Sequence, residues 1–337
     1  MGTKSIFYPF KTFCFKSIIQ SLHDLCSRTG FLEKCELWRE NNNKTNVLTD
    51  IYDGQVWKDF SSFFEEPHNI GLMLNIDWFQ PFKHTQYSVG VIYLVLMNLP
   101  RSQRFLPENV IICAIIPGPN EPKHNINSCM RKMVDELLIL WKGVVFTLST
   151  FPLPVRIRAA LLCVTADIPA TRKACGFTSH NSSRGCSKCL KHFQIAVGKP
   201  SDYGGYDREN WNLRTNEHRG ENGMKHVAKT KKERKNIERE KGVRYSVLNE
   251  LSYFDCVRFH TIDPMHNLLL GTAKHVMNIW IKNGLISNNQ FDEIQQCVDS
   301  FSVPSDIGRI PYKISSGFSS FKADQWRSWI VIYSTLH

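Results

Sequence analysis

The sequence has no long hydrophobic run. Its longest apolar stretch, Val89 to Met97, is far shorter than the roughly 20 residues that a helix needs to cross a bilayer. The N-terminus also lacks the pattern of a secretory signal peptide, because Pro9 and Lys11 interrupt its apolar residues and Lys16 follows directly. We therefore expect a soluble, intracellular protein without a membrane-spanning segment.

The cysteines do not form the pattern of a disulfide framework. There are 11 of them, an odd number, and most stand alone inside apolar segments, as Cys113, Cys163 and Cys256 do. This usage is typical of a reducing compartment, the cytosol or the nucleus. Internal repeats are also absent, so 337 residues predict one elaborated domain or two.

Acidic residues are outnumbered by basic ones. The chain has 31 Asp and Glu against 42 Lys and Arg, which gives a formal net charge of +11. A surplus of this size favours a polyanionic partner, although it does not determine the fold.

The apolar pattern predicts an α/β fold. Residues 72–76, 87–96 and 110–116 are strand-like runs with short connections, which indicates a meander. An amphipathic helix over 127–142 follows, and then a fourth strand over 155–166. This order resembles an RNase H-like core, a mixed sheet with flanking helices in which the first and fourth strands lie side by side.

Two aspartates follow strands of this predicted sheet. Asp77 comes after the first strand and Asp167 after the fourth, two residues before Pro169. Paired carboxylates at neighbouring strand ends are suited to Mg²⁺ or Mn²⁺, which prefer oxygen ligands and keep exchangeable waters. Two such ions can activate the oxygens exchanged in phosphodiester cleavage. The alternative is that each Asp is only a turn residue at the end of a strand.

A possible zinc site follows Asp167. Cys175, His180, Cys186 and Cys189 lie in a loop rich in glycine and serine, and the last two form a Cys-x-x-Cys pair. Thiolates and imidazole at such spacings are typical of a structural Zn²⁺ site. His192 is a substitute for His180 as a ligand, and four unrelated reduced residues are the alternative.

Two further motifs carry weaker signals. Asp263 and His266 lie about one turn apart before an apolar helix, and they either orient a metal-bound water or cap the helix. A basic segment between them and the cysteine loop is suited to phosphate contacts, to nuclear import, or to a solvated helix. Its basic residues are Lys225, Lys229, Lys231, Lys232, Arg234, Lys235, Arg239 and Lys241.

Taken together, these residues resemble the transposase domain of eukaryotic DNA transposons of the CACTA (En/Spm) group, in the DDE/D superfamily. The resemblance extends over most of the chain, and Asp263-x-x-His266 is similar to an element found in several such transposases. The other matching motifs, in order, are Ile51-Tyr-Asp-Gly54, Asn75-Ile-Asp77-Trp-Phe-Gln-Pro81, Asn98-Leu-Pro-Arg101, Pro117-Gly-Pro119, Asp167-Ile-Pro169-Ala170 and Gly185-Cys186-Ser-Lys-Cys189.

The resemblance implies a function and a division of the chain. Asp77 and Asp167 would be the first two acids of a DDE/D triad that cleaves transposon ends and joins them to target DNA, in the nucleus and as a homo-oligomer on DNA. Residues 1–65 would be an N-terminal helical and loop segment, 66–200 the core with its zinc loop, and 201–337 a basic linker and a mainly helical insertion.

The family's third acid has no clear counterpart in the sequence. Glu293 and Asp324 are available, but neither ends a strand beside the first pair. We therefore expect a fragment or a domesticated remnant with an incomplete core. The alternatives are a non-catalytic protein that binds DNA or chromatin on the same fold, and a zinc-stabilised interaction module whose basic segment only directs nuclear import.

Overall fold

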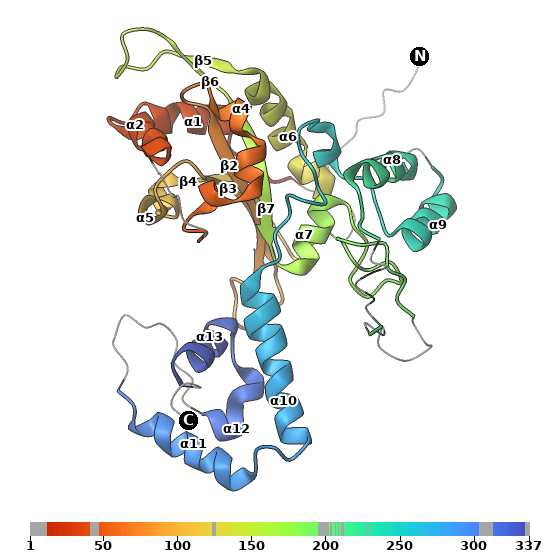
Figure 1. Ribbon diagram of the computed structural model, residues 1–337. Helices are drawn as coiled ribbons and strands as arrows, with labels where there is room; N and C mark the ends of the chain where they lie inside the picture. The colour runs from red at the N-terminus through yellow and green to blue at the C-terminus, as the bar shows by residue number, and fades with distance from the viewer. Residues whose placement is uncertain are drawn as a thin grey trace. The chain divides into compact units, whose positions relative to one another are not determined.

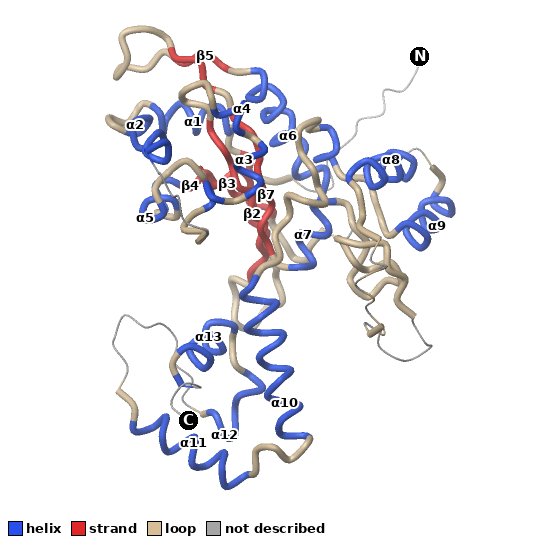
Figure 2. Tube along the Cα trace, viewed as in Figure 1, coloured by secondary structure: helices blue, strands red, loops and turns tan. Residues whose placement is uncertain are grey.

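The computed structural model has a mixed α/β fold (Figures 1 and 2). It describes residues 12–40, 47–122, 126–194, 202, 204–205, 207, 209, 212–227, 229–302 and 313–333. The chain divides into two compact units, Met1–Thr261 and Ile262–His337, and each is described by itself.

The larger unit is built on a mixed five-stranded sheet in the order β1-β4-β3-β2-β7. β2, β3 and β4 form an antiparallel meander, and β7 pairs in parallel with β2. The predicted meander and the neighbouring first and fourth predicted strands are therefore confirmed. The strands are β1 (Cys14–Phe15), β2 (Ile70–Phe79), β3 (Val89–Leu96), β4 (Val110–Ile116), β7 (Ala159–Ala166), and the separate hairpin β5 (Val144–Phe146) and β6 (Val155–Ile157).

Helices flank this sheet, and the longest described helix, α6, packs against β7 and β4. The six buried residues of α6 recur three or four positions apart, which is the amphipathic pattern that the sequence predicted. The helices of the larger unit are α1 (Ile18–Cys26), α2 (Phe31–Glu36), α3 (Gln55–Asp59), α4 (Ser61–Phe64), α5 (Arg101–Arg104), α6 (Ile126–Lys142), α7 (Ile168–Cys175), α8 (Asn216–Val227) and α9 (Lys231–Lys241).

The central strands are buried because their residues are apolar on both faces. Leu72, Leu74, Ile92 and Leu94 are fully buried in one continuous core. Runs of this kind are expected where helices and loops cover both faces of a sheet. The core fixes the position of β2 and β7, and with it the place where each strand ends.

The predicted fourth strand over 155–166 is wrong in one respect, because it is interrupted at Arg158. β6 ends at Ile157 and belongs to the hairpin with β5, whereas β7 starts at Ala159. The Arg158 guanidinium donates to the Trp141 carbonyl at 2.9 Å and lies over the Phe63 and Trp141 rings. An arginine held on aromatic rings in this way separates two strands that the apolar pattern joins.

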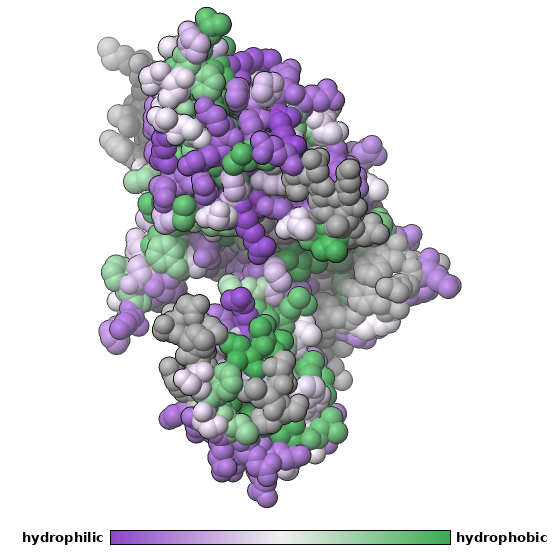
Figure 3. Space-filling view, turned by 60° about the vertical axis from the view of Figure 1, so that its left-hand side comes forward, coloured by the Kyte–Doolittle hydropathy of each residue, from purple (hydrophilic) through white to green (hydrophobic). Residues whose placement is uncertain are grey.

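The smaller unit is helical around a second, separate core that includes Trp326 and Tyr333. Several apolar side chains reach its surface, among them Leu268, Trp280 and Leu285. Hydrophobic residues, drawn in green, are visible on the face of this unit that Figure 3 shows. No helix in the described part of the chain is both long and apolar enough to cross a membrane. The helices of the smaller unit are a π-helix (Met265–Ala273), α10 (Lys274–Lys282), α11 (Asn288–Ser300), α12 (Ile314–Gly317) and α13 (Ala323–Val331).

Candidate functional site

The parallel pairing of β2 and β7 brings Asp77 and Asp167 to neighbouring positions. Ile76 lies opposite Ala166 in the ladder, and the next residue on each strand is one of the two aspartates. Neighbouring strands are about 4.8 Å apart, so the two backbones are close enough for their carboxylates to share one cation. Asp167 directly follows β7, as the sequence predicted, whereas the prediction that Asp77 ends its strand is wrong. β2 continues to Phe79, because Asp77 still pairs with Val91 of β3. The register nevertheless places the two aspartates side by side.

Each carboxylate makes a short local hydrogen bond and keeps its charge unpaired. Asp77 Oδ1 accepts from the Trp78 amide at 2.8 Å, and Asp167 Oδ1 accepts from the Ala170 amide at 2.7 Å. The second bond caps α7, as the turn-residue interpretation also predicts. Among the described residues, neither aspartate forms an ion pair, so no side-chain cation neutralises this edge of the sheet.

A polar residue lies two positions before each of the two aspartates. Asn75 pairs with Thr165 across the same two strands, and Thr165 Oγ1 accepts a hydrogen bond from Thr261 Oγ1 at 2.9 Å. The Asn75 Nδ2 group is buried and has no partner among the described residues. A buried amide without a partner costs free energy, and such groups gather at functional sites. The sequence signal for it was an asparagine inside an otherwise apolar strand.

A short segment after the basic region extends this sheet beyond β7. The Val164 amide donates to the Phe259 carbonyl at 2.8 Å, and the Thr261 amide donates to the Val164 carbonyl at 2.9 Å. His260, between them, forms a parallel bridge with Val164. Sequence analysis missed this pairing, because the segment is too short for an alternating pattern.

His260 ties the cysteine loop to this segment. Its Nδ1 donates to the Cys256 carbonyl at 2.7 Å, because a carbonyl can only accept, and its Nε2 therefore accepts from the Ser187 hydroxyl at 2.9 Å. Burial and the nearby Lys188 charge lower the pKa of His260 to about 4. The imidazole is therefore neutral at neutral pH, and its role is to position the loop.

The structure brings together two of the four predicted zinc ligands. The amides of Lys188 and Cys189 both donate to Cys186 Sγ at 3.3 Å, which places the Cys-x-x-Cys pair on one turn. Cys175 is fully buried and forms a hydrogen bond with Cys256. This bond, together with burial, raises the pKa of Cys175. His180 is exposed. Among the described residues, no three His, Cys, Asp or Glu side chains gather in a metal-binding group. The pair Cys186 and Cys189 fits a metal only with two further ligands.

The basic segment forms two helices rather than one. α8 ends at Val227, and α9 starts at Lys231 after its N-cap residue, Thr230. The Glu233 amide donates to the Thr230 hydroxyl, and the Thr230 amide donates to the Glu233 carboxylate, which together form a capping box. α8 and α9 lie side by side. A cavity of about 640 Å³ separates them from α6 and α7. Its lining residues are Ile126, Asn127, Lys173, His226, Val227, Lys231, Arg234, Lys235, Glu238, Arg244 and Tyr245.

Asp263 and His266 contact one another in the smaller unit. His266 Nδ1 pairs with Asp263 Oδ2, while Asp263 Oδ1 accepts from the Met265 amide at 2.8 Å. The aspartate thus combines a turn with the orientation of the imidazole, and the orientation of a metal-bound water by this pair stays a prediction. Glu293 and Asp324, the other available acids, lie on α11 and α13 of the same unit.

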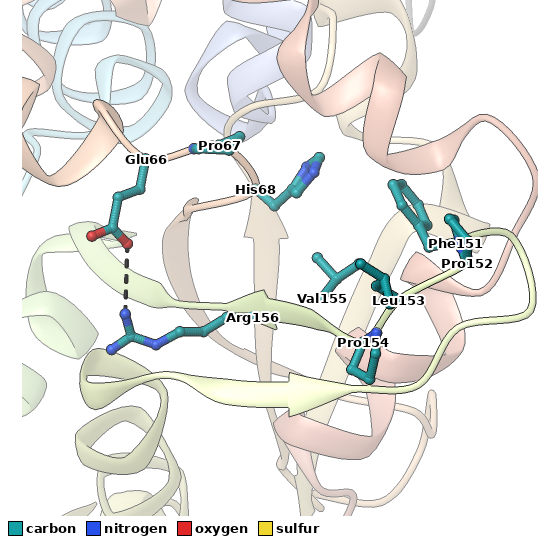
Figure 4. A pocket seen from close by; sticks show the side chains of 9 residues that line it. All are labelled: Glu66, Pro67, His68, Phe151, Pro152, Leu153, Pro154, Val155 and Arg156. Atoms are coloured by element: carbon teal, nitrogen blue, oxygen red, sulfur yellow. Dashed lines mark ion pairs between the residues drawn. The ribbon is translucent and has the colours of Figure 1, made fainter.

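A second cavity, of about 410 Å³, lies at the other end of β2 (Figure 4). His68, two residues before β2, faces Phe151 with ring centroids 5.7 Å apart, and Glu66 pairs with Arg156 at 3.7 Å. Proline and apolar side chains form most of the remaining lining. None of the predicted site residues lines it, so the edge that carries Asp77 and Asp167 is the candidate active site.

Comparison with known proteins gives one match. The sequence model of the transposase family tnp2 matches residues 45–238, which is more than half of the chain and includes both Asp77 and Asp167. No curated protein matches the chain.

Proposed function

The chain belongs to the transposase family tnp2, and from this premise we propose that Asp77 and Asp167 are two of the three acids of a DDE/D catalytic centre. The observation that carries the proposal is their adjacency on two parallel strands, Asp77 within β2 and Asp167 directly after β7, without an ion pair to either among the described residues. The strand order supports an RNase H-like assignment, since a meander is followed by a fourth strand parallel to its first.

The proposed reaction is phosphodiester hydrolysis at a transposon end, followed by attack of the freed 3′-hydroxyl on target DNA. Asp77 and Asp167 would hold Mg²⁺ or Mn²⁺, which suits two hard carboxylate ligands. The bound metal would supply Lewis-acid activation of the attacking and leaving oxygens. Asp167 is held in place by its own cap on α7, and Asp77 by its bond to the next amide.

The lack of an identified third acid favours a second candidate function. Glu293 and Asp324, the acids available as a third ligand, lie on the helices α11 and α13 of the smaller unit and not at the end of a strand. A domesticated remnant that binds DNA or chromatin without cleaving it would need the fold and the basic surface but not the triad. DNA is the partner in both cases. Nuclear localisation and assembly as a homo-oligomer on DNA belong to the same proposal.

Metal binding tests the carrying observation directly. We expect the purified chain to bind Mn²⁺, and Asp77→Asn or Asp167→Asn to weaken this binding at least about tenfold, because each removes one charged oxygen ligand. Electron paramagnetic resonance of free Mn²⁺ during titration measures it. Asp24→Asn, an exposed aspartate on α1, is the control and should leave binding unchanged. Equal Mn²⁺ affinity in all four proteins would remove the proposed site.

We also propose that Cys186 and Cys189 bind a structural Zn²⁺. A closed zinc site contributes folding free energy, so Cys186→Ser with Cys189→Ser should lower the melting temperature and remove zinc from the purified protein. Plasma mass spectrometry of the wild-type protein measures the zinc content. Cys297→Ser, at an exposed cysteine in the smaller unit, is the control. A wild-type protein that contains no zinc would contradict this part of the proposal.

A further inference from the structure

The cavity between the α8–α9 pair and helices α6 and α7 is strongly basic. Five of its lining residues are Lys173, Lys231, Arg234, Lys235 and Arg244, and Glu238 is the one acidic residue among the described residues that line it. Burial alone would raise the pKa of Glu238, but hydrogen bonds from His226 and Arg244 lower it to about 2. The one carboxylate of the cavity is therefore ionised and already paired.

One face of α9 lines this cavity, and we call it the groove face; the opposite side is the outer face. Lys231, Arg234, Lys235 and Glu238 recur three or four residues apart and lie on one face. Lys232 and Arg239 are equally exposed but do not line the cavity. α9 has no buried residue, so it contributes little to the core. Its cationic face is the feature that distinguishes it.

The wall opposite α9 joins this cavity to the acid pair. Lys173 donates to Glu121 Oε2 at 2.7 Å, and its ammonium lies 5.3 Å from the centre of the Trp78 ring. Trp78 follows Asp77 directly on β2, and α7, which carries Lys173, begins at the Asp167 cap. Lys173 therefore contacts β2, the strand that carries Asp77, and belongs to the helix that Asp167 caps.

The floor of the cavity is rigidly held. Asn127 Nδ2 donates to the Tyr245 carbonyl at 3.1 Å, and the Val247 amide donates to Asn127 Oδ1 at 2.8 Å. A preformed concave surface with several cations and one aromatic ring is suited to a sugar-phosphate backbone, which needs distributed positive charge rather than a single deep pocket.

We propose that this cavity binds the phosphate backbone of the duplex DNA whose strand is delivered to Asp77 and Asp167. The inference rests on the proposed function and makes it more specific, because it selects one face of the basic segment as the DNA contact. Lys231 and Lys235 contact phosphates directly, whereas Lys232 and Arg239 contribute only long-range attraction.

The test compares two double variants that remove the same charge from the same helix. Lys231→Ala with Lys235→Ala alters the groove face, and Lys232→Ala with Arg239→Ala alters the outer face. All four side chains are exposed, so both proteins should fold. Fluorescence anisotropy with a labelled duplex at several salt concentrations measures the affinity of the full chain.

We expect the groove variant to bind about 100-fold more weakly, since each charge-assisted contact contributes about tenfold. Its plot of log affinity against log salt should also be shallower by about 2, one for each lost phosphate contact. The outer-face variant should lose less than about tenfold and keep the wild-type slope. Equal losses in the two variants would overturn the groove and leave DNA binding intact. A wild-type chain that does not bind DNA would overturn the proposed function together with the groove.

Discussion

Asp77→Asn and Asp167→Asn should each lower metal-dependent nicking of DNA by roughly 10³-fold or more. Each substitution removes one charged oxygen at the point where β2 and β7 bring the two residues together. A neutral amide is a poor ligand for Mg²⁺ or Mn²⁺, so the loss should appear in the rate of cleavage and not in the affinity for DNA.

Asparagine is chosen because it preserves the local structure. It accepts the same hydrogen bond at a helix N-cap as aspartate, so Asp167→Asn should still cap α7 through the Ala170 amide. Asp77→Asn likewise keeps an acceptor for the Trp78 amide. Asp24→Asn is again the control. Conversion of supercoiled plasmid to nicked circles measures the activity, and a rate that survives Asp167→Asn would exclude the two-acid mechanism.

The second large effect is a loss of stability in acid that depends on His260. Its folded pKa of about 4 lies below the ordinary value near 6.5, because burial and the charges of Lys188, Arg172 and Arg219 disfavour the imidazolium. Between these two values the unfolded chain binds a proton that the folded chain does not. Stability is therefore complete above about pH 6.5 and falls as the pH drops towards 4, by about 3 kcal/mol in total.

The measurement is the free energy of unfolding in urea at several pH values. In His260→Gln this contribution should be missing, so the difference between wild type and variant should shrink by about 3 kcal/mol between pH 7 and pH 4. Other groups also titrate in this pH range, but their contributions cancel in the difference between the unfolding free energies of wild type and variant. His84→Gln, at an exposed histidine, should retain the full wild-type slope. A pH-independent difference for His260→Gln would show that the imidazole is not held neutral by burial.

The Cys-x-x-Cys loop illustrates what a linear pattern can predict. Cys186 and Cys189 are separated by two residues, close enough for one turn to bring both thiols together, and the structure forms that turn through the Lys188 and Cys189 amides. Cys175 lies in the same stretch of sequence, yet it contacts Cys256, which is far away along the chain. Spacing alone could not find this partner, because burial decides which thiols meet.

The basic segment shows the same limit. Its charge and its lack of an apolar stripe were evident from the sequence, and the capping residues Thr230 and Glu233 explain where the second helix starts. The division of its lysines into a groove face and an outer face depends on which elements pack beside α9. In our proposal the groove face contacts the DNA backbone directly, whereas the outer face contributes only a general attraction to nucleic acid.

The sequence by itself determined the strands of the meander, the long helix α6, and the acid that follows β7, although it ended the first strand too early, since β2 continues past Asp77 to Phe79. These are local properties, because the spacing of apolar residues repeats every two or every 3.6 positions. The tertiary structure decided that Ile76 lies opposite Ala166, so that Asp77 and Asp167 become neighbours. A shift of one residue in this pairing would leave both strands intact but would separate the carboxylates, because register is set by packing across the whole sheet.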